Sequence, residues 1–153
     1  MATVEEVQAK LTALIANLSP QARRQLGQKI GQALRKSQSN RIARQQNPDG
    51  SAFEPRKPRK EFGKKKGRIK RKAMFAKLRT ARHLKVRSNG NEVSVGFNGS
   101  SAAIAAVHQY GLTARPSKEK DFKVRYAQRE LLGISEQDLS MLNKLVIEQI
   151  SKS

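Results

Sequence analysis

A run of positive charge in the middle of the chain places the strongest limit on the fold. Residues 56–72 (RKPRKEFGKKKGRIKRK) hold eleven Lys or Arg side chains and one Glu, a net charge of +10. This is half of the +20 carried by all 153 residues. Cations at this density repel one another unless water or a polyanion surrounds them. The run therefore cannot enter a hydrophobic core, and the folded body must come from the residues on either side of it.

The remaining composition predicts a small protein with a modest aliphatic core. Hydrophobic residues make up 37% of the chain, aromatic residues only 5%, and Trp is absent. We expect a single structural domain with a folded body of about 100 residues. The absence of cysteine excludes a disulfide framework and thiolate metal sites, and it favours a reducing cytosol. Met1 leads into an acidic amphipathic segment rather than a signal peptide, and no apolar run approaches a membrane span, so no membrane partner is expected.

The first 47 residues predict a helical hairpin. Apolar residues recur at spacings of three and four over residues 3–17, as in an amphipathic helix. Ser19 and Pro20 then supply an N-cap and a first-turn proline for a second helix. The sequence Asn-Pro-Asp-Gly at 47–50 favours a tight turn that ends this helix. No acid occurs between residues 21 and 46, and a second basic surface is expected from Arg23, Arg24, Lys29, Arg35, Lys36, Arg41 and Arg44.

Residues 48–73 are predicted to form a basic loop or arm, because no apolar period appears before Met74. Its cations could be merely solvated, could neutralise nucleic-acid phosphates, or could dock on an acidic protein surface. Charge alone does not separate the last two. Phe62 is the one aromatic residue in the run, so sequence-specific recognition of single strands is not expected. The candidate partner or nucleic-acid contacts are Arg56, Lys57, Arg59, Lys60, Lys64, Lys65, Lys66, Arg68, Lys70, Arg71 and Lys72.

Residues 74–153 predict the α+β core. Apolar and polar residues alternate over 84–86 and 93–97 around Asn89-Gly90, which predicts a β-hairpin. An Ala-rich helix is expected next, capped by Ser100 or Ser101 and ended by Gly111. A third strand over 122–126 and a final helix after a capping box at residues 135–138 follow. The predicted class is therefore α+β, with a small antiparallel sheet of about three strands covered on one face by helices.

The inventory for catalysis is thin, and we expect no enzyme, no cofactor and no metal. Only two histidines are present, and no Gly-rich phosphate loop occurs. His108 lies close to Tyr110 in sequence and could be a general base, but a helix-end residue at a subunit contact is the better interpretation. We therefore name His108 and Tyr110 as candidate subunit contacts. Glu136 and Asp138 belong to the first turn of a helix, where the helix dipole favours acids.

Three stretches of the chain resemble one protein family. They cover residues 18–57 (LSPQARRQLGQKIGQALRKSQSNRIARQQNPDGSAFEPRK), 95–112 (VGFNGSSAAIAAVHQYGL) and 129–139 (RELLGISEQDL). The helix that runs into a Pro-Asp-Gly turn, and the Ala-rich helix that ends in His-Gln-Tyr-Gly, are the more specific motifs. In this order and spacing they resemble the phage virion morphogenesis family, the tail-completion proteins of contractile-tailed temperate phages.

The resemblance implies a structural virion protein that acts late in assembly, at the head-proximal end of the tail, for head–tail joining. It implies a place in the tail and neck of the virion, with the host cytoplasm as the site of assembly. Implied partners are other neck and tail proteins, namely the tail tube or terminator and the head connector. A homo-oligomeric ring, with a hexamer favoured, and non-specific DNA contact are further expectations. The alternative is a non-enzymatic protein that binds nucleic acid independently of sequence, typical of a pI near 11.

Overall fold

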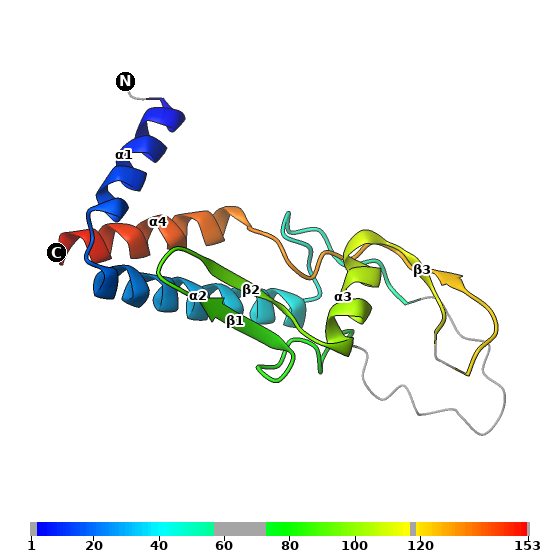
Figure 1. The fold of residues 1–153 in the computed structure, drawn as a ribbon. Coiled ribbons are helices and arrows are strands. Elements are labelled where there is room, and N and C mark those ends of the chain that lie inside the picture. Colours follow the sequence, from blue (N-terminus) through cyan, green and yellow to red (C-terminus); the bar gives the residue numbers. More distant parts are fainter. Residues whose placement is uncertain (1–2, 57–72, 117–118, 153) are drawn as a thin grey trace. The chain divides into compact units, whose positions relative to one another are not determined.

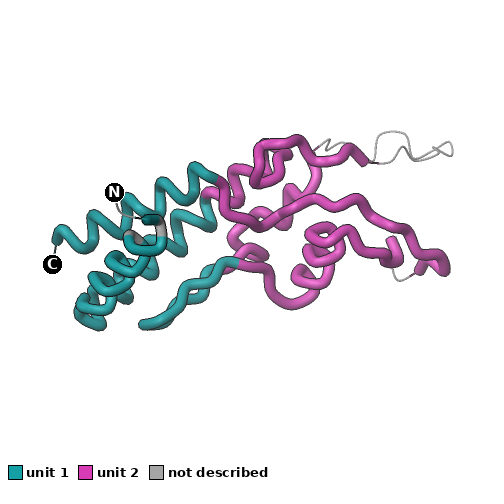
Figure 2. The backbone as a smooth tube through the Cα atoms, turned by 90° about the horizontal axis from the view of Figure 1, so that it is seen from above, with its two compact units in different colours: residues 1–36, 86–95, 136–153 teal, residues 37–85, 96–135 magenta. Residues whose placement is uncertain are grey.

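The computed structural model describes residues 3–56, 73–116 and 119–152 (Figure 1). Four α-helices and four short strands follow one another in the order α1, α2, β1, β2, α3, β3, β4, α4. These elements form two compact units (Figure 2). Unit 1 contains residues 1–36, 86–95 and 136–153, and unit 2 contains residues 37–85 and 96–135. The α+β class predicted from the sequence is confirmed. None of the helices in the described ranges is both long and apolar enough to cross a membrane.

Helix α1 (Val4–Ala16) begins at a complete capping box. The Thr3 hydroxyl accepts a hydrogen bond from the Glu6 backbone N–H at 3.1 Å, and the Glu6 carboxylate accepts from the Thr3 N–H at 3.0 Å. Two of the free N–H groups at the helix start are thereby satisfied. The helix ends at Asn17. Its predicted range of 3–17 is therefore confirmed by the caps themselves.

Helix α2 (Pro20–Ala43) contributes residues to both units. The Ser19 hydroxyl accepts a hydrogen bond from the Ala22 N–H at 3.1 Å, as expected of an N-cap beside a first-turn proline. The helix stops before the predicted turn, where Gln45 adopts a left-handed conformation with φ of 57°. The turn at 47–50 then closes through a hydrogen bond of 2.9 Å from the Gly50 N–H to the Asn47 carbonyl.

In unit 1, α4 (Glu136–Ser151) and the outer part of the β-hairpin lie against α2. The hairpin pairs β1 (Leu84–Ser88) with β2 (Val93–Phe97), as the Asn89-Gly90 signal predicted. It approaches α2 closely because two positions on the helix are glycine. A Cβ at Gly27 would lie 3.0 Å from Val93 Cγ2, and one at Gly31 would overlap Val86. Small residues at these two positions therefore set the distance between hairpin and helix.

The sheet differs from the single three-stranded sheet that the sequence predicted. The segment near 122–126 does form a strand, β4 (Val124–Arg125), but it pairs antiparallel with β3 (Thr113–Ala114) and not with the hairpin. The described residues thus hold two separate two-stranded sheets. Strand β3 is only two residues long and has no alternating pattern that would reveal it in the sequence. Without β3, the sequence placed β4 in the same sheet as the hairpin.

Helix α3 (Ser100–Tyr110) also differs from expectation at its start. The N-cap is Gly99, with φ of 60° and no side-chain hydrogen bond, rather than Ser100 or Ser101. Ser101 is buried, and its hydroxyl instead lies 2.6 Å from His83 Nδ1. The predicted end is confirmed, because Gly111 is the C-cap with a left-handed φ of 62°.

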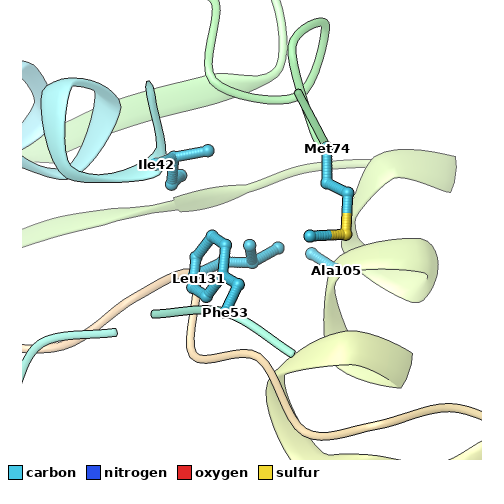
Figure 3. Packing of buried hydrophobic residues seen from close by; sticks show 5 residues of the cluster. All are labelled: Ile42, Phe53, Met74, Ala105 and Leu131. Atoms are coloured by element: carbon cyan, nitrogen blue, oxygen red, sulfur yellow. The ribbon is translucent and has the colours of Figure 1, made fainter. Parts of the chain in front are cut away.

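The hydrophobic core of unit 2 is formed by residues from five separate parts of the chain. Figure 3 shows the side chains of these residues converging beside α3. Phe75, Leu78 and Phe97 pack around them as partly buried neighbours. Both flanks of the basic segment, one before residue 57 and one after residue 72, contribute a side chain to this core. The five core residues are Ile42, Phe53, Met74, Ala105 and Leu131.

Candidate interaction surfaces

The two flanks of the basic segment 57–72 are fastened to one residue, Gln45. Its backbone carbonyl accepts a hydrogen bond from the Phe53 N–H at 2.8 Å. Its side-chain amide pairs with the backbone of Met74, accepting from the N–H at 2.8 Å and donating to the carbonyl at 2.9 Å. The left-handed backbone of Gln45 places these groups beyond the end of α2. The chain is therefore held at the same place before and after the basic segment.

Arg129 fixes the flank that precedes the segment. Its guanidinium donates to the carbonyl of Glu54 at 2.7 Å and to that of Pro55 at 3.1 Å. Arg129 is only 5% exposed, and burial is the main cause that lowers the pKa of its guanidinium. Phe53 is buried beside this flank, whereas Arg56 is exposed at the surface. Neighbouring backbone groups thus define where the segment leaves unit 2.

A second buried cation, Arg41, joins the end of α2 to the chain around residue 130. Its guanidinium donates to the carbonyls of Gln46, Glu130 and Leu131 at 2.9 to 3.0 Å, and to Gln38 Oε1 at 2.5 Å. Arg41 is 3% exposed. The prediction that this residue belongs to an outer basic surface is therefore wrong. Since three backbone carbonyls and one side-chain oxygen accept hydrogen bonds from its two terminal nitrogens, Arg41 stabilises the fold instead of facing a partner.

The outward side of α3 is apolar, which is unusual for a surface helix. Ala103, Ile104 and Tyr110 are exposed there, and Val107 is half-buried between them. We call these four residues the α3 arc. At 100° per residue they span about 120° of the helix. The inward side is occupied by buried Ser101 and Ala105. A helix whose outward side is also apolar is normally covered there by another part of the protein or by a partner. The α3 arc is therefore a candidate contact surface.

Strands β3 and β4 form a ribbon with two different faces. Thr113 lies opposite Arg125, and Ala114 lies opposite Val124. Because side chains alternate along a strand, Ala114 and Val124 share one face while Thr113 and Arg125 share the other. The apolar face continues to Leu112, which is 44% exposed and whose carbonyl accepts a hydrogen bond from the Tyr126 N–H at 3.0 Å. Among the described residues this sheet has two strands, so each strand pairs with another strand along one edge only.

His108 lies between these surfaces, in a stack of aromatic rings. Its ring centroid is 4.7 Å from that of Phe75 and 5.0 Å from that of Tyr126, both edge to face. Its Nδ1 is buried and has no hydrogen-bond partner among the described residues. Burial, followed by the nearby Arg129 charge, lowers the pKa of His108 from 6.5 to about 4. The imidazole is therefore neutral at physiological pH and holds α3 against the ribbon, while Tyr110 is 68% exposed.

Two comparisons with known proteins identify the family of the chain. The model of the phage virion morphogenesis family matches residues 2–151. The chain is also 40% identical over 144 residues to "Tail completion protein S" of Escherichia phage P2, an alignment that covers 94% of both proteins. The chain belongs to the phage virion morphogenesis family. No solved structure matches it.

Most of the contact residues that the sequence predicted for this member of the phage virion morphogenesis family are not among the described residues. Lys57, Arg59, Lys60, Lys64, Lys65, Lys66, Arg68, Lys70, Arg71 and Lys72 lie outside the described residues. The structure does describe the anchors of that segment, and sequence reasoning missed the role of Gln45 and of Arg41. Gln45 is a polar residue just after a helix, and nothing near it in sequence indicates that it binds Met74. Arg41 is a cation within a helix, and nothing near it in sequence indicates that it is buried. Over the described parts of this family member, no three His, Cys, Asp or Glu side chains gather as a metal site would require.

The low pKa of His108 predicts that acid destabilises unit 2. An unfolded His108 takes up a proton at about pH 6.5, but the folded one does so only near pH 4. Stability should therefore be complete above pH 6.5 and should fall as the pH decreases to 4. For a half-exposed ring we expect a loss of about 1 to 2 kcal/mol, less than the full shift implies because water screens the charge. Urea midpoints of the wild type and His108→Gln, measured from pH 7 to pH 4, should converge as the pH falls. Parallel curves would exclude this role.

Proposed function

We propose that this chain is a tail-completion protein that acts without catalysis in virion assembly. The observation that carries the proposal is the match to a P2 protein named for tail completion, which is 40% identical and extends over 94% of both chains. The likeness is not confined to one motif. The α3 arc and the ribbon favour the same conclusion, because they offer apolar contact area in place of a catalytic constellation. We place its action at the head-proximal end of the tail, where it joins tail to head, in the assembled virion and beforehand in the host cytoplasm.

The same proposal includes a homo-oligomeric ring, with six subunits favoured. Its subunit contact is the α3 arc of one copy against a ribbon edge of the next, a head-to-tail contact that closes by rotation. Tyr110 supplies exposed aromatic area for this contact, and His108 holds the helix behind it. An aromatic anchor surrounded by smaller apolar residues is the usual composition of an interface centre. The same packing covers an edge of the β3–β4 ribbon that would otherwise be exposed.

The basic arm, Arg56 with residues 57–72, is proposed to contact a neighbouring component of the neck or tail. Its support is that Gln45 and Arg129 fasten the flanks of the part of the sequence that holds eleven cations. A charge of this size would attract an acidic partner and speed its association at low salt. The tail tube or terminator and the head connector are the proposed partners. Contact with DNA is the other outcome that the charge allows.

The ring contact is tested by placing charge in the α3 arc. Ile104→Glu with Tyr110→Glu should turn a ring into monomers in analytical ultracentrifugation and in electron micrographs. Loss of one central aromatic anchor costs about 2 kcal/mol or more, a factor of about 30 in Kd. Phage that encode the double variant should yield unjoined heads and tails. Leu139→Glu in α4, at a residue with 54% exposure, is the control and should leave rings and infectivity unchanged. Normal rings from the double variant would exclude this contact without touching the proposal of tail completion.

A further inference from the structure

The exposed face of α2 within unit 1 consists of glutamines flanked by cations. Gln21, Gln25, Gln28 and Gln32 are exposed and, at 100° per residue, line the centre of this face. Four cations flank them, Arg24 with Arg35 on one side and Lys29 with Lys36 on the other. We call these eight residues the α2 strip. The sequence holds no acid between residues 21 and 46, so nothing on the helix itself neutralises the strip.

The packing of unit 1 keeps the strip turned toward solvent. Gly27 and Gly31 face the hairpin, and at 100° per residue they lie about 110° around the helix from the centre of the strip. Leu26, which is 4% exposed, fills the interior. Arg24, Lys29 and Lys36 are all exposed. A rotation of α2 that buried these cations would therefore break the contacts of Gly27, Gly31 and Leu26.

Lys152, the residue that follows α4, adds a positive charge at one edge of the strip. The Lys29 ammonium donates to Gln149 Oε1 at 3.2 Å, and Gln149 is 4% exposed. Lys152 lies close enough to Lys29 to lower its pKa, first through hydrogen bonding and then through charge repulsion, while Glu148 acts in the opposite direction. Lys29 of α2 and Lys152, the residue after the end of α4, thus lie near one another. An anion placed between them would relieve their repulsion.

The partner that fits the strip is a nucleic-acid backbone, not a protein. Protein interfaces depend on aromatic and aliphatic anchors at their centre, and the strip has none. Arg, Lys and Gln side chains are the groups that contact phosphate oxygens and sugars without reading sequence. From Gln21 to Lys36 the helix extends about 22 Å, which matches several successive phosphates of one strand. We propose that the α2 strip binds double-stranded DNA independently of sequence. This site is separate from the basic arm, and tail completion does not require it.

The test is the salt dependence of DNA binding by the full chain. The variant Arg24→Gln/Lys29→Gln/Arg35→Gln/Lys36→Gln is compared with wild type by fluorescence anisotropy on a 30-base-pair duplex between 50 and 200 mM salt. Each phosphate contact contributes about 0.9 to the slope of log affinity against log salt, so the slope should decrease by about 3 to 4. At 100 mM salt the Kd should rise at least about tenfold.

The matched control removes the same charge elsewhere. Lys77→Gln/Arg82→Gln/Lys123→Gln/Lys144→Gln alters four exposed cations outside the strip and should change the slope by less than about 1. Equal weakening by both variants would show a general charge effect and would overturn the proposal, as would unchanged binding by the strip variant. A strip variant that loses binding to polyglutamate but keeps its DNA affinity would assign the surface to an acidic protein instead. Circular dichroism checks that both variants fold.

A crosslinking experiment locates the contact directly. The chain contains no cysteine, so Gln28→Cys or Ser140→Cys can be labelled at a single position with a photoreactive group. Gln28 lies in the middle of the strip, and Ser140 is exposed on α4. Crosslinks to the duplex should form from residue 28 and be at least about tenfold weaker from residue 140 at 100 mM salt, where contacts outside the site are screened. Equal yields from the two positions would contradict the assignment.

Discussion

Phe53→Ala should remove about 3 to 5 kcal/mol from the free energy of unfolding, because it empties the centre of the unit 2 core. Phe53 is 4% exposed, and its ring packs against that of Phe75 with centroids 5.8 Å apart. The loss combines the transfer free energy of the ring with the cavity left among Ile42, Met74 and Leu131. Urea unfolding followed by circular dichroism measures it. The melting temperature should fall by about 10 °C for a chain of this size.

Phe122→Ala is the control with the same chemistry, since Phe122 is 56% exposed. It should change stability by no more than about 0.5 kcal/mol. Because Phe53 also anchors the flank of the basic segment, we expect its variant to lose assembly activity before it unfolds completely. Equal destabilisation by the two variants would mean that Phe53 is not the centre of the core.

Arg41→Met should cost about 3 kcal/mol, the second large effect. The substitution leaves the carbonyls of Gln46, Glu130 and Leu131 in a buried place without their charged donor. Arg41→Lys should recover little of this loss, since one ammonium cannot reproduce the fork of donors that the guanidinium provides. Chemical denaturation of both variants measures the two differences.

The control for Arg41 is Arg44→Met, three residues further along. Arg44 is exposed, and its Nε donates a hydrogen bond to Gln46 Oε1 at 3.3 Å. It should lose less than about 0.5 kcal/mol. If Arg41→Met were equally harmless, the hydrogen bonds of the buried guanidinium would contribute no net stability, and the join between α2 and residue 130 would have to depend on apolar packing alone.

Features that depend on neighbouring residues were predictable from the sequence. The capping box of Thr3 and Glu6, the Ser19-Pro20 start and the Gly111 end are each set by groups within a few positions of one another. The hairpin follows from Asn89, whose side chain accepts hydrogen bonds from the Asn91 and Glu92 N–H groups at 2.7 and 2.8 Å. Such local chemistry is present in the sequence itself. It predicted both ends of α1, the start of α2 and the end of α3, but not the start of α3 at Gly99.

Features that depend on distant residues were not predictable in the same way. Gln45 and Met74 are 29 positions apart, and Arg41 and Leu131 are 90 apart. Nothing in the spacing of a single sequence reports these pairs. Strand β3 has two residues, too few for an alternating pattern, so its pairing with β4 appeared only in the structure. The charge of the basic segment can be read directly from the sequence, but the distant residues that hold its flanks, Gln45 and Arg129, cannot.

The proposed role in tail completion predicts what happens when a phage that encodes this chain loses it. A nonsense mutation in its gene should leave host lysis, DNA-filled heads and tails intact, while joined particles disappear. Electron microscopy of the lysate, with the wild-type chain supplied in trans as the control, counts heads, tails and complete virions. We predict separate filled heads and tails, restored to infectious particles by the supplied chain. Infectious virions with joined tails in its absence would contradict a function in tail completion.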